Sequence, residues 1–400
     1  MNKKLIQHKN FSIDKYSSSK SIKKSFDKIL DHIFKQIDST KDTYHFLSNK
    51  FQFNFKINDF KRFKKFQNIV IVGMGGSSLG SNAIYEFLKF KIKKNVIFFD
   101  NLEKEKINNF KKSYDSKKSL FIIISKSGNT IETISTFFEL SILKNKAKNI
   151  IIISEKNNNI LYSISKKYKL MFIEHKKYLG GRYSVLSEVG MVPSYLMGIN
   201  IKKIRKNLKN YLSKDKKILK SGSIFLSQII SQKKFKNLIF LNYSPKLEKF
   251  LFWLQQLIAE SLGKNGKGIL PIVSNCPKDH HSVLQLYLDG PQDKMFYFFS
   301  EATTKYKSEK KKKFSYRKYF NNNSLDKIKN SQMRALKTIL IKNKAPVREF
   351  ILDSSSEETL GELFTYFILE TSIAGRLINL NPFDQPAVEQ VKSLTKKILN

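Results

Sequence analysis

Short apolar runs alternate with longer amphipathic segments from about residue 65 onward. Four runs are rich in β-branched or aromatic residues, and each is followed by turn residues: 68–73 (NIVIVG), 96–99 (VIFF), 120–125 (LFIIIS) and 149–154 (NIIIIS). Continuous apolar runs that alternate with helices predict a parallel sheet covered on both faces. Their spacing of about 25 to 30 residues is long enough for right-handed crossovers.

A weaker second cycle follows the first. Strands are predicted at 237–241, 295–300 and 347–352, and helices at 252–262, 357–379 and 386–399. The pattern predicts two α/β domains in tandem, although the similarity of the halves is too weak to establish a repeat. Residues 1–65 are predicted to be a polar, helical extension, and the lysine-rich stretch 305–324 a solvated loop. The expected divisions are therefore 1–65, 66–200, 201–380 and a last helical segment, 381–400.

Charge changes this picture less than its size suggests. The formal net charge is +41, but only seven of the 74 basic residues are arginine. Nucleic-acid readers usually depend on Arg for bidentate contacts, and these lysines are spread along the chain among Asn, Ile and Phe, which share A/T-rich codons. We therefore expect a composition bias and no nucleic-acid partner. A positive field would still attract an anionic substrate.

The location and redox state are inferred from what the chain contains. Cys276 is the single cysteine, which excludes an internal disulfide and fits a reducing compartment. No apolar run approaches the roughly 20 residues of a membrane helix. A cytoplasmic protein without membrane contact is expected.

The first candidate site is the glycine loop 73–80 (GMGGSSLG) after the first strand. Glycines allow a sharp turn and a close approach to a ligand, and the next helix directs its N-terminal amides at an anion. A dinucleotide fingerprint would need glycine at Ser78, although Asp100 could serve as its ribose acid. A nucleotide site and a plain strand–helix turn both stay open for this loop alone.

The second candidate is Ser125-Lys-Ser-Gly-Asn-Thr130, which leads from the third strand into a helix. Three hydroxyls and a helix N-terminus within six residues suit a phosphate monoester. An ordinary helix cap is the alternative.

Four further groups could carry chemistry. Arg182 follows two glycines in GGRYS and is a candidate oxyanion partner, with a surface salt bridge as the alternative. Glu260 ends an apolar helix, where a partly desolvated carboxylate can act as a base, although a solvated Glu is commoner. Adjacent His280 and His281 do not suit a two-histidine metal site, but one could act in acid–base chemistry. Gln385 and Lys392 are seven residues apart, which predicts one face of the last helix.

Five motifs in order resemble the glucose-6-phosphate isomerase family from about residue 65 to the C-terminus. They are the GIGGS-type loop (73–80), the SK-S/T phosphate loop (125–133), GGR-[FY]-S (180–184), ES-x-GK (260–264) and the NPFDQP segment (381–389). The chain departs from the pattern at Asn129, where Thr is common, and at Ala387, where Gly is usual. The resemblance implies two tandem sugar-isomerase (SIS) domains, each a doubly wound parallel sheet flanked by helices, plus a C-terminal catalytic helix.

The resemblance also assigns roles. Glu260 aligns with the catalytic base, Arg182 with the arginine near the enediolate, Lys392 with a lysine that assists ring opening, and His281 with a ring-opening histidine supplied by a dimer partner. His280 is the alternative for the last role. Phosphate and substrate contacts are implied for Gly75, Gly76, Ser77, Ser125, Lys126, Ser127, Thr130, Gln256 and Gln385.

The implied reaction interconverts glucose 6-phosphate and fructose 6-phosphate through a cis-enediol, with no metal and no cofactor. Two alternatives stay open: a non-catalytic sugar-phosphate regulator, which would not need Glu260 or Lys392, and a related isomerase that also accepts mannose 6-phosphate.

Overall fold

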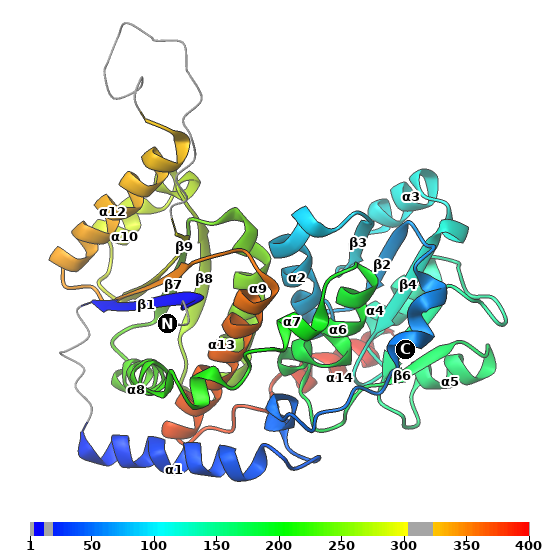
Figure 1. Ribbon diagram of the computed structural model, residues 1–400, viewed down its shortest axis with the longest axis horizontal. Coiled ribbons are helices and arrows are strands. Elements are labelled where there is room, and N and C mark those ends of the chain that lie inside the picture. Colours follow the sequence, from blue (N-terminus) through cyan, green and yellow to red (C-terminus); the bar gives the residue numbers. More distant parts are fainter. Residues whose placement is uncertain (1–3, 12–18, 303–322, 400) are drawn as a thin grey trace, which may run out of the picture.

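Two five-stranded sheets organise the computed structural model, which describes residues 4–11, 19–302 and 323–399. Figure 1 shows them as two lobes side by side, with helices packed between them. The strands of the first lobe are β2 (Asn68–Val72), β3 (Asn95–Phe99), β4 (Ser119–Ile124), β5 (Ile150–Ser154) and β6 (Met171–Glu174), arranged in the order β3-β2-β4-β5-β6. All neighbours in this sheet are parallel.

The second lobe repeats this order with one exception. Its strands are β7 (Asn237–Asn242), β8 (Leu270–Asn275), β9 (Lys294–Glu301), β10 (Val347–Leu352) and β1 (Ile6–Phe11), arranged as β8-β7-β9-β10-β1. Strand β1 pairs antiparallel with β10. This sheet is therefore mixed, whereas a wholly parallel sheet was expected. The expectation of a helical segment 1–65 is corrected in the same way, because residues 6–11 form an edge strand of the second sheet.

Helices cover both faces of each sheet, as expected for doubly wound domains. The first lobe has α2 (Leu79–Leu88), α3 (Lys104–Ser113), α4 (Ile131–Glu139), α5 (Ile160–Lys167) and α6 (Glu188–Leu196). The second has α1 (Lys20–Gln36), α7 (Ile201–Ile204), α8 (Lys216–Gln232), α9 (Glu248–Leu262), α10 (Leu284–Asp289), α12 (Leu325–Lys342) and α13 (Glu357–Leu377), and the last helix of the chain is α14 (Val388–Leu399). Of the expected loop 305–324, all but the last two residues lie outside the described residues.

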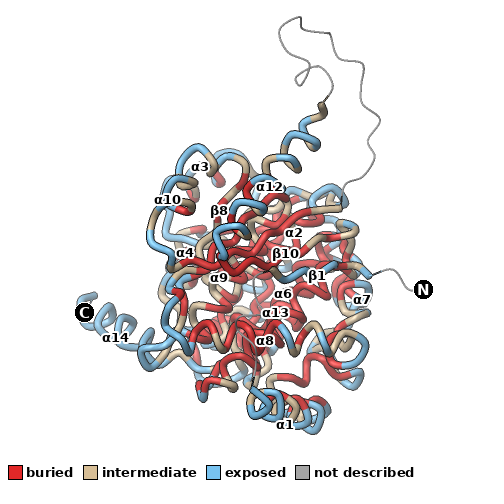
Figure 2. Tube along the Cα trace, turned by 90° about the vertical axis from the view of Figure 1, so that its left-hand side faces the viewer, coloured by how far each residue is buried: buried red, intermediate tan, exposed pale blue. Residues whose placement is uncertain are grey.

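One continuous core fills the space between the sheets. It contains the inward side chains of β2 and β7, such as Ile69 and Phe240, together with α2, α9 and α13. Helices α2 and α9 pack directly against each other across the lobes. Alternate strand residues, such as Val70 and Ile239, face separate outer cores. Figure 2 shows the buried strands and central helices in red, and α14 as an exposed helix that extends from the body.

A buried charge network fixes the edge of the second sheet. The Arg348 guanidinium of β10 is 2.7 Å from the Glu370 carboxylate of α13, and both side chains are buried. Arg348 also donates to the hydroxyls of Tyr297 and Tyr366 and to Asn10 of β1. Because Asn10 is held by a residue more than 300 positions away in sequence, local sequence patterns carry little information about β1.

Loss of one partner of this network should be costly. We expect Arg348→Met to lower the free energy of unfolding by about 3–5 kcal/mol, because it leaves the Glu370 carboxylate buried and unpaired. The double variant Arg348→Met/Glu370→Leu should recover much of that loss. Urea unfolding midpoints test this, with Lys89→Met at the surface pair with Glu86 as a control that should change little. A double variant no more stable than Arg348→Met would contradict the explanation.

Candidate active site

The Arg182 guanidinium is the centre of a polar cluster that joins three of the sequence motifs. It follows Gly180–Gly181 on a 3-10 turn (Gly181–Leu186), and the residue is only 2% exposed. Its Nε donates to Ser261 Oγ (2.8 Å), and Nη1 donates to Glu260 Oε2 (3.2 Å) and Gln385 Oε1 (2.7 Å). Nη2 donates to the carbonyls of Pro382 (2.6 Å) and Asp384 (3.0 Å). All five guanidinium N–H groups therefore have acceptors.

Glu260 is fixed by two donors. Its Oε2 accepts from Arg182, and its Oε1 accepts from Gln256 Nε2 at 3.0 Å, one turn earlier on α9. The Glu260 side chain keeps about a third of its surface exposed (34%), while Arg182 is enclosed. The carboxylate is therefore oriented on one side and accessible on the other, as a general base requires.

The glycine loop lies against this cluster. Gly75 has φ +53°, and a Cβ there would lie 2.8 Å from Gln256 Nε2. A Cβ on Gly76 would lie 2.3 Å from the carbonyl carbon of Gly181 and 2.5 Å from Arg182 N. Glycine at these positions lets the loop after β2 contact both α9 and the 3-10 turn that carries Arg182.

The three hydroxyls of the Ser125–Thr130 loop converge as expected. Ser125 Oγ is 2.8 Å from Thr130 Oγ1 and 3.5 Å from Ser127 Oγ, just before α4 begins at Ile131. Thr130 occupies the N-cap position without capping the helix through its side chain. Ile124 O is 2.9 Å from where a Cβ on Gly73 would lie, so this loop adjoins the glycine loop.

Charged groups surround the loop. Lys126 Nζ is 3.7 Å from Glu155. Burial lowers the pKa of Lys126, and the Glu155 carboxylate opposes this effect. Behind Lys126, the wholly buried His175 imidazole has a pKa lowered to about 4, chiefly because of burial and then because of Lys126. The ring is therefore neutral at pH 7, and Lys126 supplies the positive charge beside the hydroxyls.

Two predicted residues are not joined to the cluster. His281 is exposed on the 3-10 turn Lys278–His281, and Lys392 on α14 bonds to Glu389 at 2.7 Å. No hydrogen bond or ion pair between described residues connects either of them to Arg182 or Glu260. His280 instead bonds the Tyr243 hydroxyl through Nε2 at 2.7 Å.

The placement of Gln385 and Lys392 on one helical face is corrected. Helix α14 begins only at Val388, so Gln385 lies in the preceding loop, where Arg182 holds it. A residue before proline is disfavoured in helical geometry, and Pro386 follows Gln385 directly. The seven-residue spacing therefore does not place Gln385 and Lys392 on one face of a helix.

Several orienting residues escaped the sequence argument. Tyr183 OH bonds Ser261 Oγ (2.7 Å) and donates to Pro382 O (2.9 Å). Lys264 Nζ donates to Asp384 at both its backbone oxygen (2.6 Å) and Oδ1 (2.7 Å). Lys264 and Asp384 lie within two of the sequence motifs, but no role was predicted for them. A single sequence gives no sign that these two motifs contact each other.

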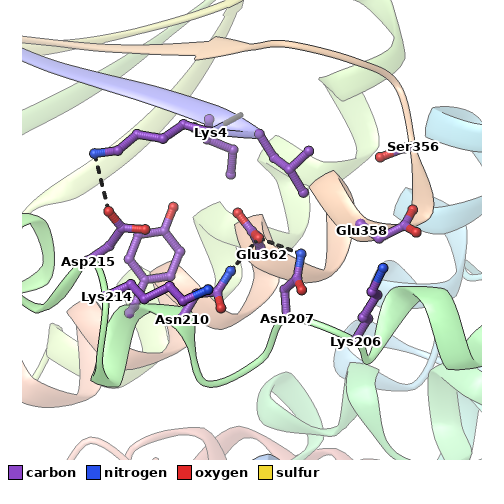
Figure 3. Close-up of a pocket in the computed structure, with 12 residues that line it drawn as sticks. Lys4, Lys206, Asn207, Asn210, Lys214, Asp215, Ser356, Glu358 and Glu362 are labelled. Atoms are coloured by element: carbon purple, nitrogen blue, oxygen red, sulfur yellow. Dashed lines mark hydrogen bonds and ion pairs between the residues drawn. The ribbon is translucent and has the colours of Figure 1, made fainter. Parts of the chain in front are cut away.

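A separate cavity of about 370 Å³ lies in the second lobe and is a weaker candidate. Figure 3 shows three of its charged groups with partners: Lys4 pairs with Asp215, and Glu362 accepts from the amides of Asn207 and Asn210. It contains none of the motif residues. Across the described ranges, no group of three or more His, Cys, Asp and Glu side chains could hold a metal ion, and no helix is long and apolar enough to cross a membrane.

The Gly76 contact should be sterically demanding. We expect Gly76→Ala to lower the free energy of unfolding by about 1–3 kcal/mol, because backbone atoms of the turn that carries Arg182 must move. Gly181→Ala is the matched control, since its Cβ would meet only Gly76 Cα at 3.9 Å. Denaturant midpoints of the two variants test this, and equal losses would show that the contact is not tight.

Comparisons with known proteins match most of the chain to one enzyme family. The family model "Phosphoglucose isomerase" matches residues 35–271. The chain is 32% identical over 365 residues to a probable glucose-6-phosphate isomerase of Methanococcus maripaludis, covering 86% of this chain and 81% of the relative. It is 31% identical over 356 residues to the glucose-6-phosphate isomerase of Methanocaldococcus jannaschii, covering 86% and 87% of the two chains.

Solved structures show the same fold at lower identity. A hypothetical protein from Thermus thermophilus superposes with a TM-score of 0.83 at 20% identity, covering 98% of this chain and all of that one. A glucose-6-phosphate isomerase from Chlamydia trachomatis gives a TM-score of 0.68 at 18% identity, covering 85% and 71% of the two chains.

Proposed function

The chain belongs to the phosphoglucose isomerase family, and on this premise we propose that its cluster around Arg182 and Glu260 interconverts glucose 6-phosphate and fructose 6-phosphate. The observation that carries the proposal is the Glu260 carboxylate, oriented by Gln256 and Arg182 beside the glycine loop. A non-catalytic regulator would not need an oriented, accessible carboxylate.

Glu260 is proposed as the base. Its carboxylate removes the C2 proton of open-chain glucose 6-phosphate, the electron pair forms the C1–C2 double bond, and the C1 carbonyl oxygen becomes an enediolate oxygen. Glu260 returns the proton to C1 while the O2 hydroxyl proton passes to O1, which gives fructose 6-phosphate. The same carboxylate serves both steps, so no redox group takes part.

Arg182 is proposed to stabilise the enediolate. Its Nη1 faces Glu260 and Gln385, the two acceptors that substrate can displace, while Nε and Nη2 stay fixed by Ser261 and backbone carbonyls. A preorganised donor of this kind supports developing negative charge without reorganisation. Gln256 and Gln385 are proposed as substrate contacts from the same positions.

The Ser125, Ser127 and Thr130 hydroxyls are proposed to hold the phosphate, with Lys126 and the Gly75–Ser77 loop beside them. The support is their convergence at the start of α4 and the adjacency of the two loops. Binding energy from the remote phosphate can then position C1 and C2 at Glu260.

Ring opening is proposed to involve His281 and Lys392, with His281 supplied by a second copy of the chain. His281 is exposed, and helix α14 carries Lys392 together with exposed apolar side chains such as Val391 and Ile398. An exposed apolar helix face favours a contact in an assembly. We therefore propose a homodimer with a shared site. We also propose that the sheets correspond to domains near 66–200 and 201–380, and a cytoplasmic location, which the lone thiol of Cys276 supports.

Replacement of Glu260 tests the central role. We expect Glu260→Gln to lower kcat by about 10²- to 10⁴-fold while affinity for a phosphorylated sugar acid changes little, because the amide cannot accept the proton. Glu260→Asp should be intermediate. A coupled assay with fructose 6-phosphate and no added metal measures this, and mannose 6-phosphate in the same assay tests the wider specificity.

The control for that experiment lies on the same helix. Glu248→Gln at the first turn of α9 makes the same chemical change away from Arg182, where Glu248 bonds Asn275. It should retain near-wild-type kcat. If Glu260→Gln keeps kcat within about threefold of the wild type, another residue is the base.

Subunit mixing tests the shared site. Glu260→Gln and His281→Ala proteins, each inactive alone, should regain up to about a quarter of wild-type activity after exchange, because each hybrid dimer holds one intact site. A double Glu260→Gln/His281→Ala partner mixed with Glu260→Gln should give no recovery. Proven exchange without recovery in the first mixture would place the whole site in one chain.

A further inference from the structure

Corresponding strands pair in the same register in the two sheets. A residue of one sheet can therefore be matched with a residue of the other by counting along the strands. Strand β2 begins at Asn68, which pairs with Ser119 of β4, and β7 begins at Asn237, which pairs with Lys294 of β9. The next neighbouring strands, β5 and β10, are in matching register as well. In the first lobe Phe121 N donates to Asn149 O, and in the second Phe296 N donates to Pro346 O, both at 2.9 Å.

Counting along β4 and β9 from Ser119 and Lys294 matches the first residues of the proposed phosphate loop with residues of the second lobe. Ser125 corresponds to Ser300, and Lys126 corresponds to Glu301. A cation beside the phosphate hydroxyls in one lobe is thus replaced by a carboxylate in the other. The loops after the first strands also correspond, because both close into a one-turn 3-10 helix, Gly75–Ser77 and Pro245–Leu247.

The Glu301 carboxylate is surrounded by donors typical of an anion site. Its Oε1 accepts from Ser244 Oγ at 2.5 Å, and its Oε2 accepts from Lys246 Nζ and Ser355 Oγ, both at 3.3 Å. Ser244 and Lys246 come from the loop that corresponds to the glycine loop. Ser355 lies just before α13, whose 21 residues begin at Glu357. Two hydroxyls and an ammonium therefore converge on one internal carboxylate.

The neighbouring helix explains why this second site would not be catalytic. Helices α2 and α9 begin at corresponding positions, Leu79 and Glu248, and the same count matches Glu260 with Lys91, which lies in the 3-10 turn Lys89–Lys91 just after α2 ends at Leu88. Lys91 Nζ pairs with Glu357 at 2.6 Å, at the start of α13. The position of the proposed base thus holds a cation in the second site, which suits an anion but cannot remove a proton.

We propose that Ser244, Lys246 and Ser355 of the second lobe form a phosphate-type anion site next to the strand end that matches the start of the Ser125–Thr130 loop, and that the Glu301 carboxylate occupies it in place of a phosphate. An attached carboxylate competes at high effective concentration, so the wild-type chain excludes free phosphate there and binds one sugar phosphate per chain. Removal of the carboxylate opens the site to a tetrahedral dianion. The side chains of Lys246 and Glu301 are 43% and 34% exposed, so such an ion has access from solvent.

The test uses the full chain with the first site disabled. Glu301→Ala is made in a Ser125→Ala/Thr130→Ala background, and binding of inorganic phosphate is measured by calorimetry at constant ionic strength. We expect phosphate to bind at least about tenfold more tightly than to the background protein, because two hydroxyls and an ammonium are released together. A further Lys246→Ala substitution should abolish the gain.

Glu139→Ala is the matched control. Glu139 is a surface residue of similar exposure whose carboxylate pairs with Lys104 and Lys111 and, among the described residues, accepts from no side-chain hydroxyl. Its removal frees lysines alone and should create no phosphate site. If Glu301→Ala binds phosphate no more tightly than Glu139→Ala does, Glu301 belongs to an ordinary surface ion pair and the proposal is wrong.

Stability gives a second readout if Glu301→Ala folds poorly. Phosphate, sulfate and acetate should raise its melting temperature more than chloride at equal ionic strength, whereas wild-type protein and Glu139→Ala should show no such selectivity. Absence of anion-selective rescue together with absence of phosphate binding would overturn the proposal. A failure of the background substitutions to weaken phosphate binding would count against the proposed role of Ser125 and Thr130 and leave this comparison intact.

Discussion

The buried guanidinium of Arg182 is the constraint on which the rest of the site depends. A charge removed from water is stable only when its donors are satisfied. The five acceptors come from α9 and from the loop that precedes α14, two segments more than 100 residues apart in the chain. The turn that carries Arg182, helix α9 and the loop before α14 therefore depend on one another for assembly. The backbone of Arg182 is fixed as well, because Trp253 Nε1 donates to Arg182 O at 3.1 Å.

That constraint also explains the position of the site between the lobes. The turn that carries Arg182 belongs to the first lobe and Glu260 to the second, so neither sheet alone presents a complete set of groups. The packing of α2 on α9 brings the glycine loop within contact of Gln256, where only glycine leaves room. Packing, polar satisfaction and the absence of a Cβ thus select the same arrangement.

Sequence patterns predicted the parts of the fold that depend on local burial. Apolar runs such as 68–73 and 120–125 became strands buried along their whole length, and the order of the motifs identified the family. Strand β1 was missed because only Ile6 is buried on it and its partners lie in β10. Strand β8 was missed because Pro271 and Ser274 interrupt its apolar pattern. The pairing of Lys264 with Asp384 was also hidden, because long-range contacts leave no periodicity in one chain.

The shared register shows how two similar frameworks can hold different chemistry. Matched positions carry opposite charges at two places: Lys126 against Glu301, and Glu260 against Lys91. At the first of the two matched sites the Lys126 cation adjoins the hydroxyl loop and the Glu260 carboxylate of α9 is accessible, whereas at the second the Glu301 carboxylate accepts from the surrounding donors and Lys91, which follows α2, pairs with α13. Each exchange keeps the local charges paired, so it is compatible with folding, while the proposed phosphate loop and the proposed base meet at only one of the two matched sites. Function here follows from the placement of a few charges, because strand order and packing are common to both lobes.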